Sequence, residues 1–301
     1  MVGMGGRFMN AVGEYYMEER HPMGNRAPRN DLVFYSLKEL KEGRGPLFID
    51  CRHLSDSAMD HLSKTLGYDK DTLPDFFEQR GEDLRKKPVE IALSECMQTG
   101  PTELSGGGIH IDRDCASTVP GLYAAGDCAS NNKTVHGATT SGYHAGKAAA
   151  TYALKRRPLD IDMNYVKELC ANFLAPLERR EGLSYRQVEA IIGKVMLENV
   201  GPERTATSLK LGLEKLKKTE ELLSELKAQD THELMRANET KSILQVGKLM
   251  AQAALYREES RFKPYHCRLD FPETDDENWC GLVLIENQKG EARLSFKKLS
   301  Y

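Results

Sequence analysis

The chain has 301 residues, 40% of them hydrophobic and 29% charged, with a mean hydropathy of -0.53. This length suits about two domains, and the composition is that of a folded globular protein, which excludes a disordered or membrane-embedded class. A formal charge of -3 gives no general attraction to nucleic acid or anionic lipid. With no stretch near the roughly 18 apolar residues of a membrane span and no apolar signal core, we expect a cytoplasmic protein with no membrane span and no nucleic-acid partner.

Helices and one strand are expected in the first third of the chain. Residues 31–44 have the spacing of an amphipathic helix that ends at two glycines, and residues 46–54 form an apolar run typical of a strand. Residues 55–90 are charged and helical in pattern but are interrupted by two prolines. A small region of mixed α/β structure is therefore predicted here.

Glycine concentrates in the first half, which predicts that the ligand site lies there. Eighteen of the 25 glycines fall in residues 1–150, and glycine is used where the backbone turns or approaches a ligand closely. Strands are expected over residues 89–95, 106–112 and 121–127. A glycine-rich loop over residues 136–142 follows, and an alanine-rich helix follows the loop.

The second half of the chain predicts a helix bundle. In the third of its periodic segments leucines recur at steps of three, four and seven residues, which places an apolar stripe on one face. Ser184, with Gln187 three residues later, has the pattern of a capping box. After residue 261 the helical period is lost, and an irregular tail is predicted. The expected helices cover residues 164–177, 184–199, 203–226 and 231–257.

The cysteines favour reduced thiols over disulfides or a metal site. There are seven, an odd number, and they include no CxxC pair and no Cys/His cluster with the spacing of metal ligands. We therefore expect no zinc or iron–sulfur site built from this chain.

One segment combines a strand, an acidic turn, a glycine-rich loop and a helix. A helix N-terminus presents unpaired N–H groups and the positive end of a dipole, so it suits an electron-rich ligand atom. Asp127, at the end of the predicted strand, is placed to accept hydrogen bonds from the hydroxyls of a ribose or ribityl chain. The alternative is that Asp127 caps a turn and the glycines of residues 136–142 only make corners. The segment alone leaves both interpretations open.

No phosphate-binding fingerprint occurs in the chain. Neither GxGxxG nor GxxxxGK[ST] is present. Gly3, Gly5 and Gly6 come nearest, but the sixth position is Phe8. We therefore expect that a dinucleotide-binding βαβ unit would have to be supplied by residues outside this sequence.

Three stretches of sequence resemble the flavoprotein family of succinate dehydrogenase and fumarate reductase. GGIHIDRDCASTVPGLYAAGDCA followed by HGATTSGYHAGKAAA is similar to that family's second FAD-contacting segment. GGRFMNAVGEYYMEERHPMGNRAPRND is similar to its capping domain. NVGPERTATSLKLGLEKLK and YREESRFKPYHCRLDFPETDDENW resemble its helical domain and tail. The SG-x-HA and REESR-x-x-PY patterns are nearest to the α-subunit of adenylylsulfate reductase.

The resemblance implies a fold class and a set of partners. It implies a mixed α/β fold: part of an FAD-binding domain with a portion of a capping domain, then an all-α helical bundle and an irregular C-terminal tail. The chain is interpreted as only the C-terminal portion of such a protein, without the N-terminal nucleotide-binding unit, which would be supplied in cis or in trans. The expected ligands and partner are FAD, a small-molecule substrate and an iron–sulfur electron-transfer subunit. The predicted domains are residues 1–95 (capping), 96–158 (FAD-binding), 159–258 (helical) and 259–301 (tail).

The same resemblance assigns site residues. Arg29 stands where the family places its active-site arginine, which is regarded as the acid that protonates a substrate carbon. A guanidinium also binds carboxylate or phosphate bidentately. The alternative for Arg29 is a surface ion pair at the start of a helix. No metal site is expected, and the residues expected to contact FAD are Gly126, Asp127, His136, Ser141, Gly142, His144 and Ala145.

Two departures from the family pattern argue against a C4 dicarboxylate substrate. Glu103 stands where the family has a substrate-binding histidine, and Thr140 stands where the dicarboxylate enzymes have an arginine. Losing a neutral donor and a cation while gaining the Glu103 carboxylate should repel a dianion, because like charges in a poorly hydrated site cost on the order of several kcal/mol. Glu103 is either a general base whose pKa is raised by burial or a solvated residue on a loop edge.

Two functions remain open on the sequence. The first is an FAD-dependent oxidoreductase subunit of the adenylylsulfate or fumarate reductase type. The second is a truncated or split non-catalytic subunit that serves binding or assembly. The departures at Glu103 and Thr140 favour the second, whereas the presence of Arg29 and Asp127 favours the first.

Overall fold

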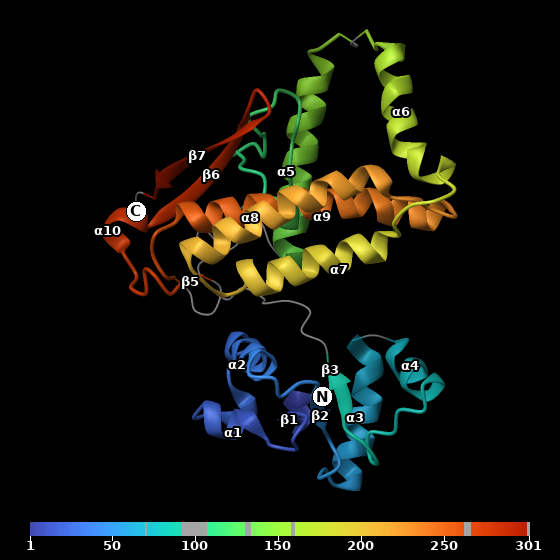
Figure 1. Ribbon diagram of the computed structural model, residues 1–301, viewed down its shortest axis with the longest axis vertical. Coiled ribbons are helices and arrows are strands. Elements are labelled where there is room, and N and C mark those ends of the chain that lie inside the picture. Colours follow the sequence, from blue (N-terminus) through green and yellow to red (C-terminus); the bar gives the residue numbers. More distant parts are fainter. Residues whose placement is uncertain (70, 92–106, 130–133, 158–159, 262–265, 300–301) are drawn as a thin grey trace. The chain divides into compact units, whose positions relative to one another are not determined.

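The computed structural model describes residues 1–69, 71–91, 107–129, 134–157, 160–261 and 266–299. The chain divides into two compact units, Met1–Gln98 and Thr99–Tyr301, and each is described by itself (Figure 1). Among the described residues, no helix is both long enough and apolar enough to cross a membrane. The division into four domains stays a prediction.

The first unit is built on a small antiparallel sheet. Its strand order is β1-β2-β3, with Phe8 opposite Ile49 and Ile49 opposite Val89. The strand predicted over residues 46–54 is present as β2. Leu47 of β2 is almost fully buried and shares a hydrophobic cluster with the buried Met17 of α1, which covers the sheet. The strands are β1 (Arg7–Met9), β2 (Leu47–Asp50) and β3 (Val89–Ile91).

In the described part of the first unit, four α-helices surround this sheet. The helix predicted over residues 31–44 is present and begins two residues earlier than expected. One of the two expected breaks in residues 55–90 lies where Pro74 occupies the first turn of a new helix, a position that needs no N–H donor. The helices are α1 (Tyr16–Arg20), α2 (Arg29–Lys41), α3 (Asp56–Asp69) and α4 (Leu73–Gln79), with single 3-10 turns η1 (Val2–Met4) and η2 (Gly24–Arg26).

A buried carboxylate ties the first unit together. The Glu39 side chain on α2 is 1% exposed and accepts hydrogen bonds from Asn10 Nδ2 at 3.0 Å, Arg20 Nη2 at 2.9 Å and Arg44 Nη2 at 2.7 Å. The Arg44 guanidinium, with Asn10 and Arg20, lowers the pKa of Glu39 from 4.5 to about 2 despite its burial. The charge of Glu39 therefore joins α2 to the segments before and after it.

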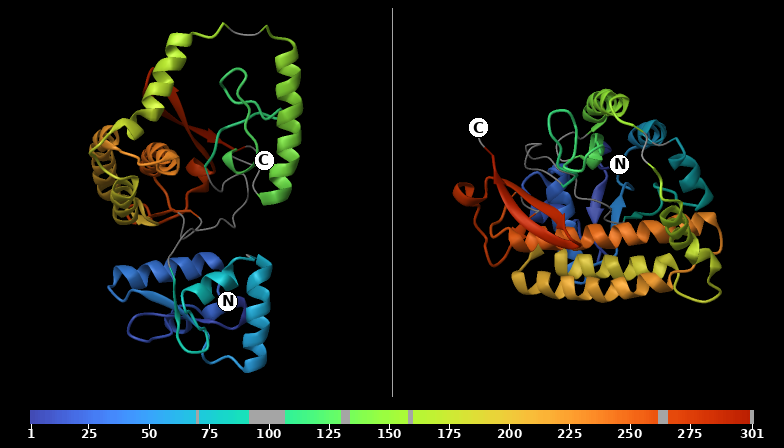
Figure 2. Two further views of the ribbon diagram at one scale, coloured as in Figure 1. Left: turned by 90° about the vertical axis from the view of Figure 1, so that its right-hand side faces the viewer. Right: turned by 90° about the horizontal axis from the view of Figure 1, so that it is seen from above.

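The second unit contains the helix bundle that the sequence predicts. All four expected helices are present, and α7, α8 and α9 pack together while α5 lies apart from them (Figure 2). Leu209, Leu216 and Leu226 of the predicted stripe are fully buried. The capping box is confirmed, because the Gln187 N–H donates to Ser184 Oγ and the Ser184 N–H donates to Gln187 Oε1. The helices are α5 (Thr134–Leu154), α6 (Met163–Glu178), α7 (Tyr185–Val195) continued by a π turn, η4 (Met196–Val200), α8 (Ala206–Glu221) continued by η5 (Leu222–Glu225), and α9 (Thr231–Tyr256).

The irregular tail predicted after residue 261 is wrong for most of its length. Strands β6 (Gly281–Gln288) and β7 (Glu291–Lys298) form an antiparallel hairpin over eight residue pairs. The two turn residues, Lys289 and Gly290, both have positive φ, at 55° and 91°. That geometry matches the right-handed twist of paired strands. The Lys-Gly pair between the apolar run GLVLI and the alternating segment ARLSF was the sequence signal of this hairpin.

Trp279 fastens the hairpin to the helix bundle. Its ring lies 5.9 Å from the ring of Tyr256 on α9 and 5.2 Å from that of Phe296 on β7. Arg257 Nη1 donates to the Trp279 carbonyl at 2.8 Å. Asp275 caps the short helix α10 (Asp276–Trp279) by accepting from the Asn278 N–H. Short parallel strands β4 (Glu203–Arg204) and β5 (Cys267–Arg268) complete the unit.

The strands predicted over residues 106–112 and 121–127 are absent from the part of the chain that is described. Residues 107–129 form turns held by two isolated bridges, Ile109 to Ala129 and Ala116 to Tyr123. Asp112 Oδ1 accepts from the N–H groups of Asp114 and Ala116, which takes up donors that a sheet would use. The local hydrogen bonds of the Asp112 side chain therefore favour a turn here, although the sequence pattern predicts a strand.

Candidate functional site

The glycine-rich segment predicted as a loop is helical. Residues 136–142 lie inside α5, which begins at Thr134, so the predicted helix start after Gly142 is wrong. Each helical glycine costs about 1 kcal/mol relative to alanine. Packing outweighs this cost, because Ser141 and Ala145 on one side of α5 are buried. The N-terminus of α5 lies before His136 rather than after the glycines.

Gly126 and Ser141 meet where the acidic turn packs on α5. The Gly126 N–H donates to Ser141 Oγ at 2.9 Å, and Ser141 Oγ donates to the Gly137 carbonyl at 2.6 Å. Gly126 has a φ of 68°, and a Cβ there would lie 3.2 Å from the Cβ of Ala138. Only glycine therefore fits without strain. We call this contact between η3 (Gly126–Cys128) and α5 the η3–α5 junction.

The remaining predicted FAD residues lie on the outside of this junction. Asp127, His136, Gly142 and His144 are exposed, and a Cβ added at Gly142 would meet no atom within 4 Å. The His144 ring lies 5.8 Å from the Tyr143 ring. The predicted residues thus divide into a buried set that holds the turn against the helix and an exposed set beside it.

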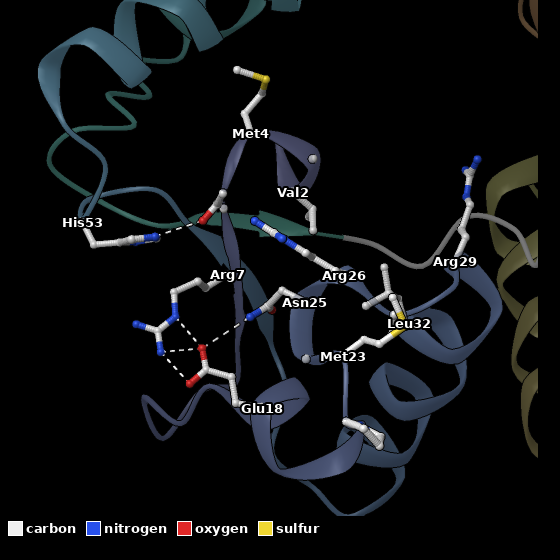
Figure 3. A pocket seen from close by; sticks show the side chains of 16 residues that line it. Val2, Met4, Arg7, Glu18, Met23, Asn25, Arg26, Arg29, Leu32 and His53 are labelled. Carbon is white, nitrogen blue, oxygen red and sulfur yellow. Dashed lines mark hydrogen bonds and ion pairs between the residues drawn. The ribbon is translucent and has the colours of Figure 1, made fainter.

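The first unit carries a pocket of about 1180 Å³ that contains Arg29 (Figure 3). Its walls come from η1 with the glycines that follow it, β1, η2 and the start of α2, together with His53. The glycines are Gly3, Gly5 and Gly6, which sequence reasoning set aside because they do not complete a fingerprint. His53 Nε2 lies 2.9 Å from the Gly5 carbonyl oxygen, which holds this wall in place.

One wall of the pocket is a closed ion pair. Arg7 Nε and Nη2 each donate to Glu18 at 2.7 Å, and the Arg7 guanidinium stacks 3.6 Å from the centre of the Tyr15 ring. Asn25 Oδ1 accepts the Phe8 N–H at 2.8 Å, which joins η2 to β1. The charge of Glu18, the carboxylate in the described lining, is therefore balanced by Arg7.

Arg26 and Arg29 add positive charge to the same pocket. Arg29 is the first residue of α2 and is exposed. The N–H groups of Asp31 and Leu32 both donate to the Pro28 carbonyl, which closes the first turn of the helix. Arg26 closes η2 and is exposed. Figure 3 shows the Arg26 guanidinium reaching back toward Val2, whereas the Arg29 side chain points away from it. The sequence analysis gave no role to Arg26, although this residue stands three positions before Arg29 in the segment NRAPR.

The remaining predicted residues are not brought into either region. Glu103 lies outside the described residues. Thr140 is exposed on α5. Within the described ranges, no three His, Cys, Asp or Glu side chains gather to hold a metal ion.

Two family models match the chain. Residues 1–142 match the family described as FAD binding domain, and residues 189–301 match the family described as fumarate reductase flavoprotein C-term. The first match covers the whole first unit and the start of the second, and the second match covers the C-terminal part of the second unit.

Curated relatives match nearly the whole chain. It is 30% identical over 320 residues to an uncharacterized FAD-dependent oxidoreductase of Methanocaldococcus jannaschii, which covers 99% of this chain and 53% of the relative. It is 29% identical over 311 residues to the succinate dehydrogenase flavoprotein subunit of Coxiella burnetii, covering 92% of this chain and 50% of the relative. The chain therefore spans about half the length of the relatives it matches.

Solved structures share the fold. Adenylylsulfate reductase from Archaeoglobus fulgidus matches with a TM-score of 0.66 and 23% identity, covering 99% of this chain and 56% of that one. A quinol fumarate reductase from E. coli matches with a TM-score of 0.71 and 22% identity, covering 99% and 55%. At these identities the likeness is one of fold.

The expectation that the chain is only the C-terminal portion and lacks the FAD-binding part is wrong. The FAD binding domain model matches residues 1–142, so the N-terminal FAD-binding part is present. The expectation rested on one missing pattern of three glycines, GxGxxG. A family model weighs the pattern of many positions at once, and the match here extends from Met1 to Gly142 without that fingerprint.

Proposed function

Because the chain belongs to the FAD-binding flavoprotein family of fumarate reductase and succinate dehydrogenase, we propose that it is the flavoprotein subunit of an FAD-dependent oxidoreductase. It would work in the cytoplasm with an iron–sulfur electron-transfer subunit. The observation that carries the proposal is the match of residues 1–142 to an FAD binding domain together with the η3–α5 junction inside that range.

The η3–α5 junction fits one side of a flavin. Gly142 and Gly146 leave open space along α5, where nothing lies within 4 Å of an added Cβ, so a flat ring can approach the helix backbone. Asp127, exposed on the turn of this junction, is proposed to accept hydrogen bonds from the ribityl hydroxyls. Ser141 and Ala145 face inward and keep the turn fixed against the helix.

FAD supplies the hydride and electron chemistry in such an enzyme. The residues of this chain are proposed to bind the cofactor and to orient its ring. His136 and His144, exposed on α5, are proposed to donate hydrogen bonds to polar atoms at the edge of the ring. Gly126 and Gly142 allow the ring to come close, and Asp127 accepts from hydroxyl groups.

Arg29 is proposed to bind the anionic substrate and to hold the proton that reaches its reacting carbon. It lies in a pocket of the first unit, at the first residue of α2, where the positive end of the helix dipole adds to its charge. Glu103 is proposed as a base. Glu103 and Thr140 disfavour a C4 dicarboxylate, so the substrate is proposed to be a different small molecule.

Reconstitution of the full chain with FAD tests the proposal. We expect bound FAD to be visible in the absorbance spectrum after removal of excess cofactor, and Asp127→Ala to weaken FAD binding more than tenfold. The matched control is Asp114→Ala, an exposed aspartate of the same segment, which should leave FAD binding unchanged. Wild-type chain that retains no FAD, or equal losses in both variants, would contradict the proposal.

Electron transfer is the second part of the test. The reconstituted chain should pass electrons from a chemical reductant to an artificial dye only when FAD is bound. A chain that binds FAD tightly yet passes no electrons would favour the non-catalytic assembly role instead.

A further inference from the structure

The pocket of the first unit contains a cation that the site described above does not use. Arg26 lines this pocket, and among the described residues its guanidinium has neither a hydrogen bond nor an ion pair. Arg7, by contrast, is fully engaged with Glu18 in a two-point contact. The charge of Arg26 thus remains available to a bound group.

Backbone geometry fixes where Arg26 is presented. The Arg26 N–H donates to the Met23 carbonyl at 3.0 Å, and the next residue, Ala27, is buried and donates to Gly24 at 3.1 Å. Gly24 has a φ of 52°, which closes the turn tightly. The root of the Arg26 side chain is therefore held at one edge of the pocket, and Figure 3 shows the guanidinium reaching inward from there.

The pocket around Arg26 is suited to a small organic ion. Apolar side chains of Val2, Met23 and Leu32 share the lining with the cations. Gly3 lines it too, and nothing lies within 4 Å of a Cβ added there. These apolar side chains can contact the body of an organic anion while the planar guanidinium binds its charged group.

We propose that Arg26 is a second anion-binding residue of this pocket, apart from Arg29, and that it selects ligands carrying an oxyanion group, a carboxylate or a phosphate. The group would be held by the planar guanidinium fork, with the body of the ligand against Val2 and Leu32. Assigning this ligand as the substrate rests on the proposed function. Anion binding itself does not need the flavin.

Binding to the full chain tests the role of Arg26. Two probes separate the two sources of the oxyanion, inorganic phosphate followed by phosphorus NMR line width and butyrate followed by saturation-transfer NMR. We expect at least one probe to bind, and Arg26→Ala to weaken that binding about tenfold or more. Arg26→Lys, which keeps the charge but loses the fork, should weaken it about threefold.

Arg80→Ala is the matched control, because Arg80 is an exposed arginine of the same unit outside the pocket, over the Phe76 ring. It should leave binding within about twofold of wild type. Binding of neither probe, binding by Arg26→Ala within twofold of wild type, or equal loss in the Arg80 variant would overturn the proposal. If Arg26→Ala does not fold, the test relies on Arg26→Lys, and unchanged anion binding in that variant would overturn the proposal.

The same samples separate this inference from the proposed function. FAD content is measured by absorbance in each variant. If Arg26→Ala loses anion binding but the wild-type chain contains no FAD, the proposed flavoenzyme function is wrong and the anion site is supported. If the wild-type chain contains FAD but Arg26→Ala binds anions as the wild type does, the flavoprotein function is supported and the anion site is wrong.

Discussion

The Arg29 pocket and the η3–α5 junction carry the predicted site residues other than Glu103, and they are built from opposite kinds of interaction. The first unit is organised by charge, with Glu39 between Arg20 and Arg44 and Glu18 against Arg7. The junction is organised by size, where the absence of a side chain at Gly126 lets a turn lie on a helix. In the proposed function, the charged pocket would bind the substrate and the junction would let the cofactor approach.

The largest expected effect is the loss of the buried charge. Glu39→Ala removes the acceptor of four hydrogen bonds and leaves Arg20 and Arg44 without this partner. We expect the free energy of unfolding to fall by about 4 kcal/mol, measured by urea unfolding followed by circular dichroism. Glu42→Ala, which removes the 43% exposed partner of the same two arginines, should cost about 0.5 kcal/mol. Similar costs for both would show that burial of Glu39 is unimportant.

Acid should remove most of the same contribution. The pKa of Glu39 is lowered from 4.5 to about 2 in the folded protein, so its stabilisation is complete above about pH 4.5 and is lost as the pH falls toward 2. The difference in unfolding free energy between wild type and Glu39→Gln should shrink by roughly 3 kcal/mol over that window. A difference that stays constant from about pH 6 to about pH 2.5 would refute this ionic account.

At the η3–α5 junction, where close packing depends on small residues, we expect substitution of Gly126 to have the largest effect on stability. Gly126→Val places a branched side chain at a φ of 68° and against Ala138, which should cost about 2–3 kcal/mol and weaken FAD binding. Gly142→Ala is the matched control, because its Cβ would meet open space, and it should leave stability unchanged or slightly raised. If the two variants behave alike in thermal unfolding, close packing at the junction is not the cause.

The smallest effect is expected at the hydroxyl that joins turn and helix. Ser141→Ala removes the acceptor of the buried Gly126 N–H and should cost about 1–2 kcal/mol. Thr139→Ala, which removes only an exposed bond to the Val135 carbonyl, should cost less than about 0.5 kcal/mol. Faster hydrogen exchange at the Gly126 amide in the serine variant alone checks the assignment.

Helices of the second unit were predictable because their signals are local. The leucine period ending at Leu226 and the capping box at Ser184 depend on residues within a few turns of each other. The strands expected in residues 106–127 failed because alternation does not reveal whether a partner strand exists or whether Asp112 binds its own backbone first.

The candidate site was predictable only in part. Gly126 and Ser141 were assigned by resemblance, and the structure brings them together. The helical state of residues 136–142 could not be seen, since glycines usually break helices and only packing against η3 reverses that preference. Arg26 escaped notice because its place in a pocket depends on η1 and β1, which are remote from it in sequence.

Hydrogen–deuterium exchange of the full chain, with and without FAD, tests the flavoprotein assignment most directly. Cofactor should slow exchange in peptides that cover residues 126–128 and 134–146, and peptides of α8 and α9 should not change. Unaltered exchange at the η3–α5 junction in chain whose absorbance proves that FAD is bound would contradict the account.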